Sequence, residues 1–107
     1  MVKIALLMAE GDDAPADPVA YASRETALDC GEPPCLVALF RLGGQDLSST
    51  LAVATNLYEY ARRFDAVLVA GSAVSGDVQR ARAKRAASLL ELTCGYGNVV
   101  VAQEDPR

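Results

Sequence analysis

The hydrophobic residues of this chain gather in four short, nearly continuous runs, separated by longer mixed segments. The runs are Val2–Met8, Leu36–Leu42, Ala66–Ala70 and Val99–Ala102. Runs without polar interruption are typical of strands buried on both faces, as in a parallel sheet covered by helices. Strict alternation would instead indicate an antiparallel sheet with one wet face. The pattern therefore predicts four buried strands in a parallel sheet.

The segment Leu47–Arg63 predicts the helix between the second and third strands. Its apolar side chains recur every three or four residues, which places them along one face of a helix. They are Leu47, Leu51, Ala54, Tyr58 and Ala61, with Val53, Leu57 and Tyr60 widening the stripe. Asp46 or Ser48 can cap the start of this helix, because a side-chain oxygen there accepts a backbone N–H that has no helical partner.

Two further segments predict helices. In Val78–Thr93, helical spacing marks one buried side, with Asp77 as the N-cap and a glycine-rich stop at Gly95-Tyr96-Gly97. That buried side consists of Val78, Ala81, Ala86, Leu89 and Leu90. Val19–Asp29 also predicts a helix, because Asp17-Pro18 combines a capping side chain with a proline at the first helical position.

The predicted elements alternate in the order β-α-β-α-β-α-β. This order predicts a single three-layer α/β domain over residues 1–107, with a mostly parallel four-stranded sheet and a flavodoxin- or Rossmann-like topology. No apolar run approaches the roughly 20 residues that cross a bilayer, so we expect no contact with a membrane. Acidic residues directly after the first run are unlike a signal peptide, and we expect a cytoplasmic protein.

Two glycine-bearing loops follow strands whose carboxyl ends meet at one edge of the predicted sheet, where ligands bind in open α/β folds. Glycines let backbone N–H groups approach an anion, and a helix N-terminus adds partial positive charge. The candidate ligand-binding residues are Gly43, Gly44, Gly71, Ser72, Ser75 and Gly76. An ordinary turn is the alternative, because neither phosphate-binding glycine motif is present and Asp77 would repel a phosphate.

Composition argues against several classes of enzyme. The chain has no His, which excludes a Ser-His-Asp triad, a Cys-His dyad and any His-based metal site within one chain. Cys30 and Cys35 could meet across a turn, but with Cys94 they are too few for a zinc site, and we expect reduced, packed thiols. The acidic residues that follow the first strand match no calcium-loop pattern. We therefore predict no catalytic residue, no metal and no cofactor.

The net charge of -4 conceals a division along the chain. Residues 1–32 carry seven acidic and two basic residues, whereas the six residues Arg80–Arg85 carry four basic residues and no acidic one. The candidate interface residues are Arg80, Arg82, Lys84 and Arg85 on one side and Asp12, Asp13 and Asp17 on the other. The basic helix of one subunit would contact the acidic segment of a neighbour. The alternative is a solvated helix face; nucleic acid is not expected, because no aromatic residue lies among the cations.

The last part of the chain resembles the closing third of bacterial microcompartment shell domains. The resemblance rests on Gly76-Asp77-Val78, an Ala-rich helix, Gly97, the apolar run Val99–Ala102 and Pro106-Arg107, about 32 residues in all. It implies a domain that tiles into hexamers. The family also has a strand hairpin upstream, for which residues 63–76 are too few.

Taken together, the sequence predicts a small non-catalytic binding or accessory protein that contacts a protein partner or forms a homo-oligomer. A nucleotide- or phosphate-binding domain that uses the Gly71–Asp77 loop for a small anionic ligand is the first alternative. An assembly or shell component is the second.

Overall fold

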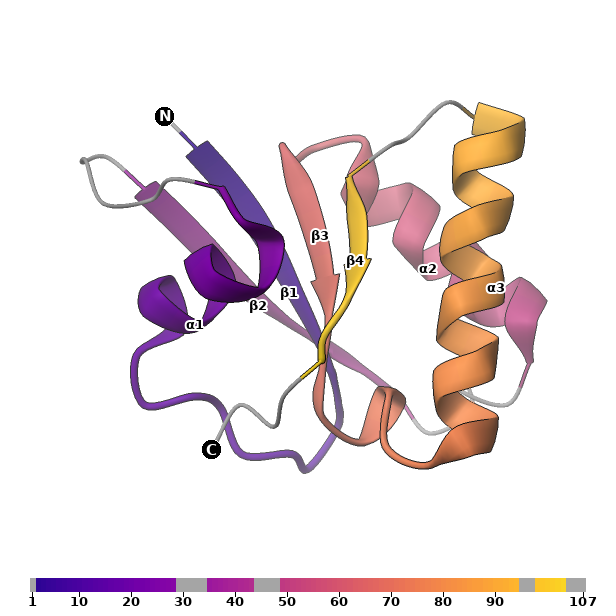
Figure 1. Ribbon diagram of the computed structural model, residues 1–107, viewed down its shortest axis with the longest axis horizontal. Coiled ribbons are helices and arrows are strands. Elements are labelled where there is room, and N and C mark those ends of the chain that lie inside the picture. The colour runs from indigo at the N-terminus through magenta and orange to yellow at the C-terminus, as the bar shows by residue number, and fades with distance from the viewer. Residues whose placement is uncertain (1, 29–34, 44–48, 95–97, 104–107) are drawn as a thin grey trace.

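The computed structural model describes residues 2–28, 35–43, 49–94 and 98–103, with strands and helices in alternation (Figure 1). The elements follow the predicted order, each within a few residues of its expected bounds. They are β1 (Val2–Ala9), α1 (Pro18–Thr26), β2 (Cys35–Leu42), α2 (Thr50–Ala61), β3 (Ala66–Val69), a 3₁₀ turn (Gly71–Ala73), α3 (Asp77–Cys94) and β4 (Val99–Val101). All strand pairs are parallel, and the sheet order is β2-β1-β3-β4.

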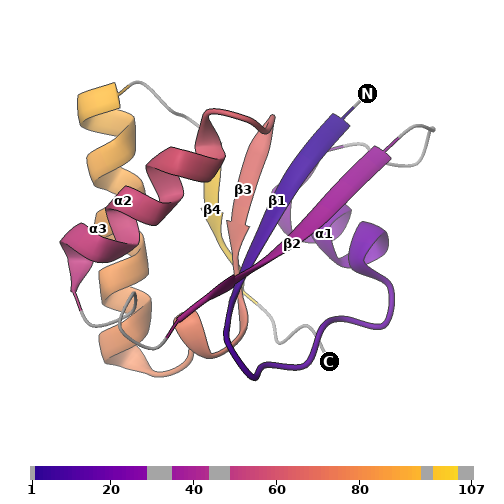
Figure 2. The same cartoon turned by 180° about the vertical axis from the view of Figure 1, so that it is seen from behind.

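The helices lie on both faces of the sheet. Helix α1 lies on one face, and α2 and α3 lie side by side on the other (Figures 1 and 2). The connection from β1 to β2 runs to one side of β1, whereas the connections from β2 to β3 and from β3 to β4 run in the opposite direction along the sheet. Because crossovers between parallel strands are right-handed, α1 lies on one face, and α2 and α3 lie on the other. The prediction of a three-layer α/β arrangement is confirmed, and the strand order is that of the flavodoxin-like doubly wound sheet.

The core is built around β1, which has a strand on each side. Residues Ile4–Met8 are completely buried. Because successive side chains of a strand point to opposite faces, Ala5 and Leu7 pack with residues of α2 and α3, whereas Ile4, Leu6 and Met8 pack with residues of α1. The predicted burial on both faces is confirmed for β1 from Ile4 onward. It is also confirmed for β3, in which every residue is buried.

The same prediction is wrong for β2. This strand pairs with β1 along one side and forms an edge of the sheet. Leu36 remains 45% exposed and Leu39 40% exposed. An edge strand has no neighbour on its outer side, so its side chains are reached by solvent even when the run is as apolar as that of a central strand.

The packing face of α2 also differs from the predicted stripe. Val53, Ala54 and Leu57 are buried, whereas Leu51 is 73% exposed and Tyr58 is 40% exposed. The helix starts later than expected, because the Ser49 hydroxyl accepts the Ala52 N–H at 3.1 Å and so caps the N-terminus. Asp46, Ser48 and Leu47 lie outside the described residues.

In α3 the structure buries a face made of small side chains. The buried residues are Ala83, Ala86, Ala87 and Leu90. Val78 and Leu89, which were expected inside, are 66% and 47% exposed. An Ala-rich face permits closer approach of α3 to α2 and to the sheet than a Leu-rich face would. The larger side chains are consequently left on the outer surface, and this reversal exposes the candidate site described next.

Candidate functional site

The loop after β1 and the candidate loop after β3 meet at the carboxyl-terminal edge of the sheet, and a carboxylate occupies the place where an anion was expected. Asp12 follows β1, and its Oδ2 atom accepts the Ser72 N–H at 2.9 Å and the Ser72 hydroxyl at 3.0 Å. The same oxygen accepts the Ala9 N–H at 3.2 Å. A Cβ added at Gly71 would lie 2.4 Å from this oxygen, and Gly71 has a φ of +74°, so the close approach requires glycine.

This contact changes the prediction of an anion site. Both Ser72 donors already bind Asp12, whose negative charge would repel a second anion. Ser75 donates its hydroxyl to the Gly71 carbonyl oxygen at 3.3 Å. Gly43 is not adjacent to these residues along the sheet edge, because β1 lies between β2 and β3.

The remaining loop residues are placed as follows. Gly44 lies outside the described residues. Gly76, with a φ of +78°, precedes α3, and its carbonyl oxygen accepts the Arg80 N–H at 3.0 Å. Asp77 is therefore the first residue of α3 rather than its cap. The predicted ligand loop is a turn that joins β3 to α3 and holds the β1–α1 connection.

Inorganic phosphate or ADP at millimolar concentration is accordingly expected to leave the melting temperature of the protein unchanged. A ligand that prefers the folded state would raise this temperature by mass action, but the Ser72 donors are occupied by Asp12. Differential scanning fluorimetry against sodium chloride of equal ionic strength checks this expectation. A dose-dependent rise that is lost in Gly76→Val would contradict it and would favour the alternative of a phosphate-binding loop.

Arg41 is a structural residue that the sequence did not single out. It lies near the end of β2, and its Nη1 atom donates to the Ala9 carbonyl oxygen at 3.3 Å and to the Asp12 carbonyl oxygen. The arginine thus holds the start of the β1–α1 connection from one side while Ser72 holds it from the other. The sequence signal that could have identified Arg41 is its position as the single charged residue in an otherwise apolar run.

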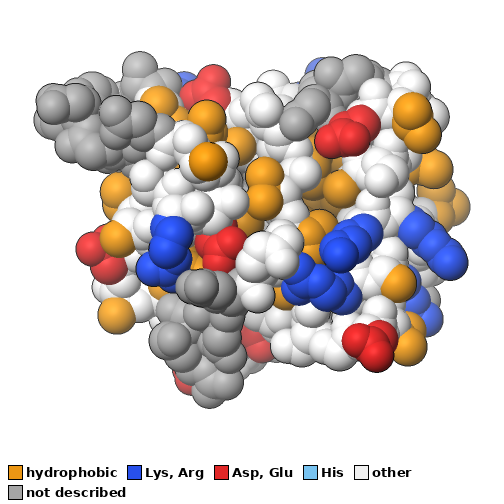
Figure 3. Space-filling view, in the orientation of Figure 1, with side chains coloured by type: hydrophobic (Ala, Val, Ile, Leu, Met, Phe, Trp, Pro, Cys, Tyr) orange, Lys and Arg blue, Asp and Glu red, His pale blue; other side chains and the backbone are white. Residues whose placement is uncertain are grey.

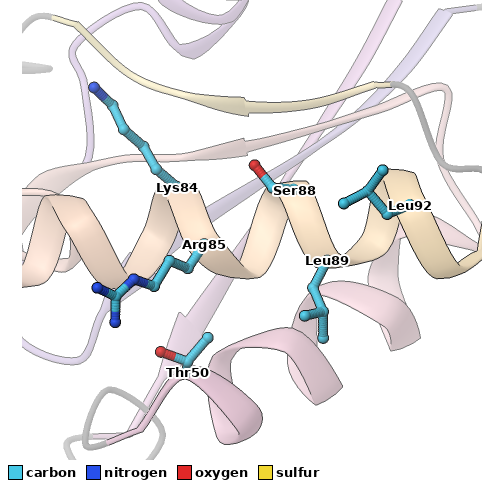
Figure 4. Close-up of a pocket in the computed structure, with 6 residues that line it drawn as sticks. All are labelled: Thr50, Lys84, Arg85, Ser88, Leu89 and Leu92. Carbon is cyan, nitrogen blue, oxygen red and sulfur yellow. The ribbon is translucent and has the colours of Figure 1, made fainter.

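The outer surface of α3 carries the second candidate site. An open hollow of about 520 Å³ lies between α3 and the start of α2 (Figure 4). We call this hollow the α3 groove, and it is lined by Thr50, Lys84, Arg85, Ser88, Leu89 and Leu92. Arg85 and Leu89 point toward α2 in this view. A neighbouring hollow of about 420 Å³ is lined by Asp77, Val78, Ala81, Arg82 and Arg85, so Arg85 borders both.

The four predicted interface cations have different environments. Arg80 is half-buried and donates from Nη1 to the Ala102 carbonyl oxygen at 2.9 Å, which ties α3 to the end of β4. Arg82 is also half-buried. Lys84 and Arg85 are exposed, and neither has an ion pair among the described residues. In Figure 3, Lys and Arg side chains gather over α3.

The three predicted interface acids divide in a similar way. Asp12 is held by Ser72, as described above. Asp17 is exposed, and its Oδ1 atom accepts the Ala20 N–H at 3.1 Å, which confirms it as the cap of α1. Asp13 is exposed, and so is Glu10, which lies in the same connection but was not among the three predicted acids. The carboxylates of these two residues make no ion pair within the described part of the chain.

The described residues offer few other chemical groups. No group of three Cys, Asp or Glu side chains among them lies close enough together to hold a metal ion. Cys30 and the side chains of Cys35 and Cys94 lie outside the described residues, so the reduced and packed state of these thiols stays a prediction. None of the three described helices is both long enough and apolar enough to span a bilayer.

Comparison of the chain with protein-family models, with curated proteins and with solved structures gave no match. The structure differs from microcompartment shell domains in the segment before the last helix. That family requires a strand hairpin upstream of its last helix, whereas this segment holds the strand β3 and the 3₁₀ turn Gly71–Ala73. All four strands of the sheet are parallel.

Proposed function

We propose that this chain is a small non-catalytic binding protein whose α3 groove receives an acidic, partly apolar segment of a protein partner. The observation that carries the proposal is the pairing of exposed cations with exposed leucines in one groove. Lys84 and Arg85 line the same groove as Leu89, which is 47% exposed, and Leu92, which is 86% exposed. Exposed apolar side chains next to charged ones are typical of protein-binding surfaces.

The composition of the groove defines the chemistry of the partner. Two cations favour carboxylates, and complementary charge speeds encounter and excludes basic partners. Thr50, the first residue of α2, also lines the groove, and the N-terminus of that helix adds partial positive charge. The leucines require apolar side chains in the same segment. An acidic segment without apolar residues is therefore expected to bind more weakly than one that contains them.

A labelled random copolymer of glutamate and tyrosine is a suitable probe, and its fluorescence anisotropy measures binding. The protein is expected to bind it at about 50 mM salt and at least tenfold more weakly at about 500 mM, where exposed charges are strongly screened. Replacing Lys84→Glu and Arg85→Glu together is expected to abolish binding. The matched control replaces Lys3→Glu and Arg63→Glu, two exposed cations outside the groove, and is expected to retain most of it.

The apolar half of the groove is checked with a second pair of variants. Leu92→Ser is expected to weaken binding several-fold, whereas Leu36→Ser, which replaces an exposed leucine of β2, leaves it unchanged. The two charge variants also separate the proposal from a nonspecific effect. If Lys84→Glu with Arg85→Glu and the control Lys3→Glu with Arg63→Glu lose copolymer binding equally, the proposal is contradicted, because binding would then depend on net charge alone. Equal binding of poly-lysine would contradict it as well.

A further inference from the structure

The chain itself carries a surface with the chemistry that the α3 groove requires. The connection between β1 and α1, residues 10–17, is here called the acidic loop. Its exposed residues are Glu10, Gly11, Asp13, Ala14, Ala16 and Asp17. Three carboxylates thus stand beside two exposed methyl groups. Carboxylates suit Lys84 and Arg85, and the alanine methyl groups suit the leucines of the groove.

The acidic loop is held in place before any partner arrives. Oδ2 of Asp12 accepts three hydrogen bonds, from Ala9 and from both donors of Ser72, and Arg41 binds the Asp12 carbonyl oxygen. Pro15 is buried, and Asp17 caps α1. A loop fixed at both ends and in the middle loses little conformational entropy on binding, and this favours association.

A symmetric contact between two copies of the groove is unfavourable. Lys84 and Arg85 lie near the middle of α3, so an antiparallel pair of α3 helices would place these cations opposite their own copies. Like charges at such close range are destabilising. A groove that binds a second copy must therefore accept a different surface of that copy, which is a heterologous contact.

The two complementary surfaces do not meet within one chain, since no ion pair joins Lys84 or Arg85 to the acidic loop among the described residues. Helix α3 lies at one end of the long axis, and the acidic loop runs toward α1, away from α3 (Figures 1 and 2). We infer that the acidic loop of one copy occupies the α3 groove of the next, so that the protein assembles head to tail. This inference rests on the proposed binding role of the groove. It names the partner as a second copy of the chain.

Sedimentation velocity over a wide range of protein concentration tests the inference. At about 50 mM salt the mean mass is expected to rise with concentration, and at about 500 mM salt it is expected to remain that of a monomer. A groove variant, Lys84→Gln with Arg85→Gln, and a loop variant, Glu10→Gln with Asp13→Asn, are each expected to self-associate about tenfold more weakly, as for the loss of two exposed ion pairs. All four positions are exposed, and circular dichroism confirms that each variant is folded.

Mixing the two variants provides the decisive measurement. The loop variant keeps an intact groove and the groove variant keeps an intact loop, so one native contact forms between them. The mixture is expected to give one-to-one dimers and no larger species. A control mixture pairs the groove variant with a control variant, Lys3→Gln with Glu59→Gln. Both replaced residues are exposed and lie on other elements, so the control chain keeps its acidic loop and its groove intact.

Three results would overturn the inference. The first is a wild-type protein that stays monomeric at every concentration and low salt. The second is a mixture of the two variants that shows no dimer. The third is an association that both variants retain. If the glutamate–tyrosine copolymer still binds the groove in any of these cases, the proposed function stands and the partner is an acidic protein other than a second copy. If the copolymer also fails to bind, both proposals fall.

Discussion

Replacing Leu7→Ala is expected to lower the free energy of unfolding by about 3–5 kcal/mol, the range for deletion of a fully buried leucine side chain. Leu7 is completely buried in β1, with β2 on one side and β3 on the other. Both neighbours are held by parallel ladders, so we expect the surrounding structure to collapse into the cavity only in part. For a domain of this size each kcal/mol corresponds to about 4–8 °C in melting temperature. Urea denaturation and thermal melting by circular dichroism measure the loss.

The control for this prediction is Leu36→Ala. Leu36 belongs to an apolar run as continuous as that of Leu7, but it is 45% exposed at the edge of the sheet. Its replacement is expected to cost about 1 kcal/mol or less, because only part of the side chain leaves an apolar environment. Comparable losses in the two variants would contradict the assignment of β1 to the centre of the sheet and of β2 to its edge.

These two leucines show what hydrophobic patterning predicts and what it does not. The four runs gave the strands within one residue at each end, because continuous apolar runs of this length between turn-forming residues are typical of α/β strands. The runs do not contain the strand order, which depends on the direction of each crossover. Burial on both faces follows from that order, so it was predicted correctly for β1 and wrongly for β2.

Gly71→Ala is expected to destabilise the protein by about 2–3 kcal/mol, and about 1 kcal/mol of this effect should depend on Asp12. A left-handed φ costs a residue with a Cβ atom roughly 1–2 kcal/mol. The added Cβ would also lie 2.4 Å from Oδ2 of Asp12, so the carboxylate must leave Ser72. Gly76→Ala is the matched control. Gly76 has a φ of +78° but nothing within 4 Å of its added Cβ, so only the backbone cost remains.

A double-mutant cycle isolates the contact with the carboxylate. Asp12→Ala alone is expected to cost about 1–3 kcal/mol, because it leaves the part-buried Ala9 N–H and both Ser72 donors without their acceptor. Combined with Gly71→Ala, it is expected to cost at least about 1 kcal/mol less than the sum of the single changes, since the hydrogen bonds are lost only once. Strict additivity in urea unfolding would show that Gly71 does not pack against Asp12.

The candidate site was predicted in part. The carboxyl-terminal edge, the cap at Asp17 and the basic character of α3 all follow from local spacing and composition. The contact between Asp12 and Ser72 joins residues that are distant in the chain, and only the pairing of β1 with β3 brings them together. The exposed leucines of α3 were missed for another reason. An Ala-rich helix has more than one face apolar enough to pack, and the close approach of α2 and α3 selected the face with the smallest side chains.

The central position of β1 has a consequence for synthesis of the chain. Its pairing partners come later in the sequence, since Val2 pairs with Cys35 and Ile4 pairs with Ala66. During translation the five completely buried residues Ile4–Met8 leave the ribosome before β2 and β3, and they have no partner until β2, and then β3, have been made. Non-local parallel pairing of this kind is slow, and an unpaired apolar strand is prone to aggregate. Chaperone dependence of the nascent chain is therefore expected to end once β3 has emerged.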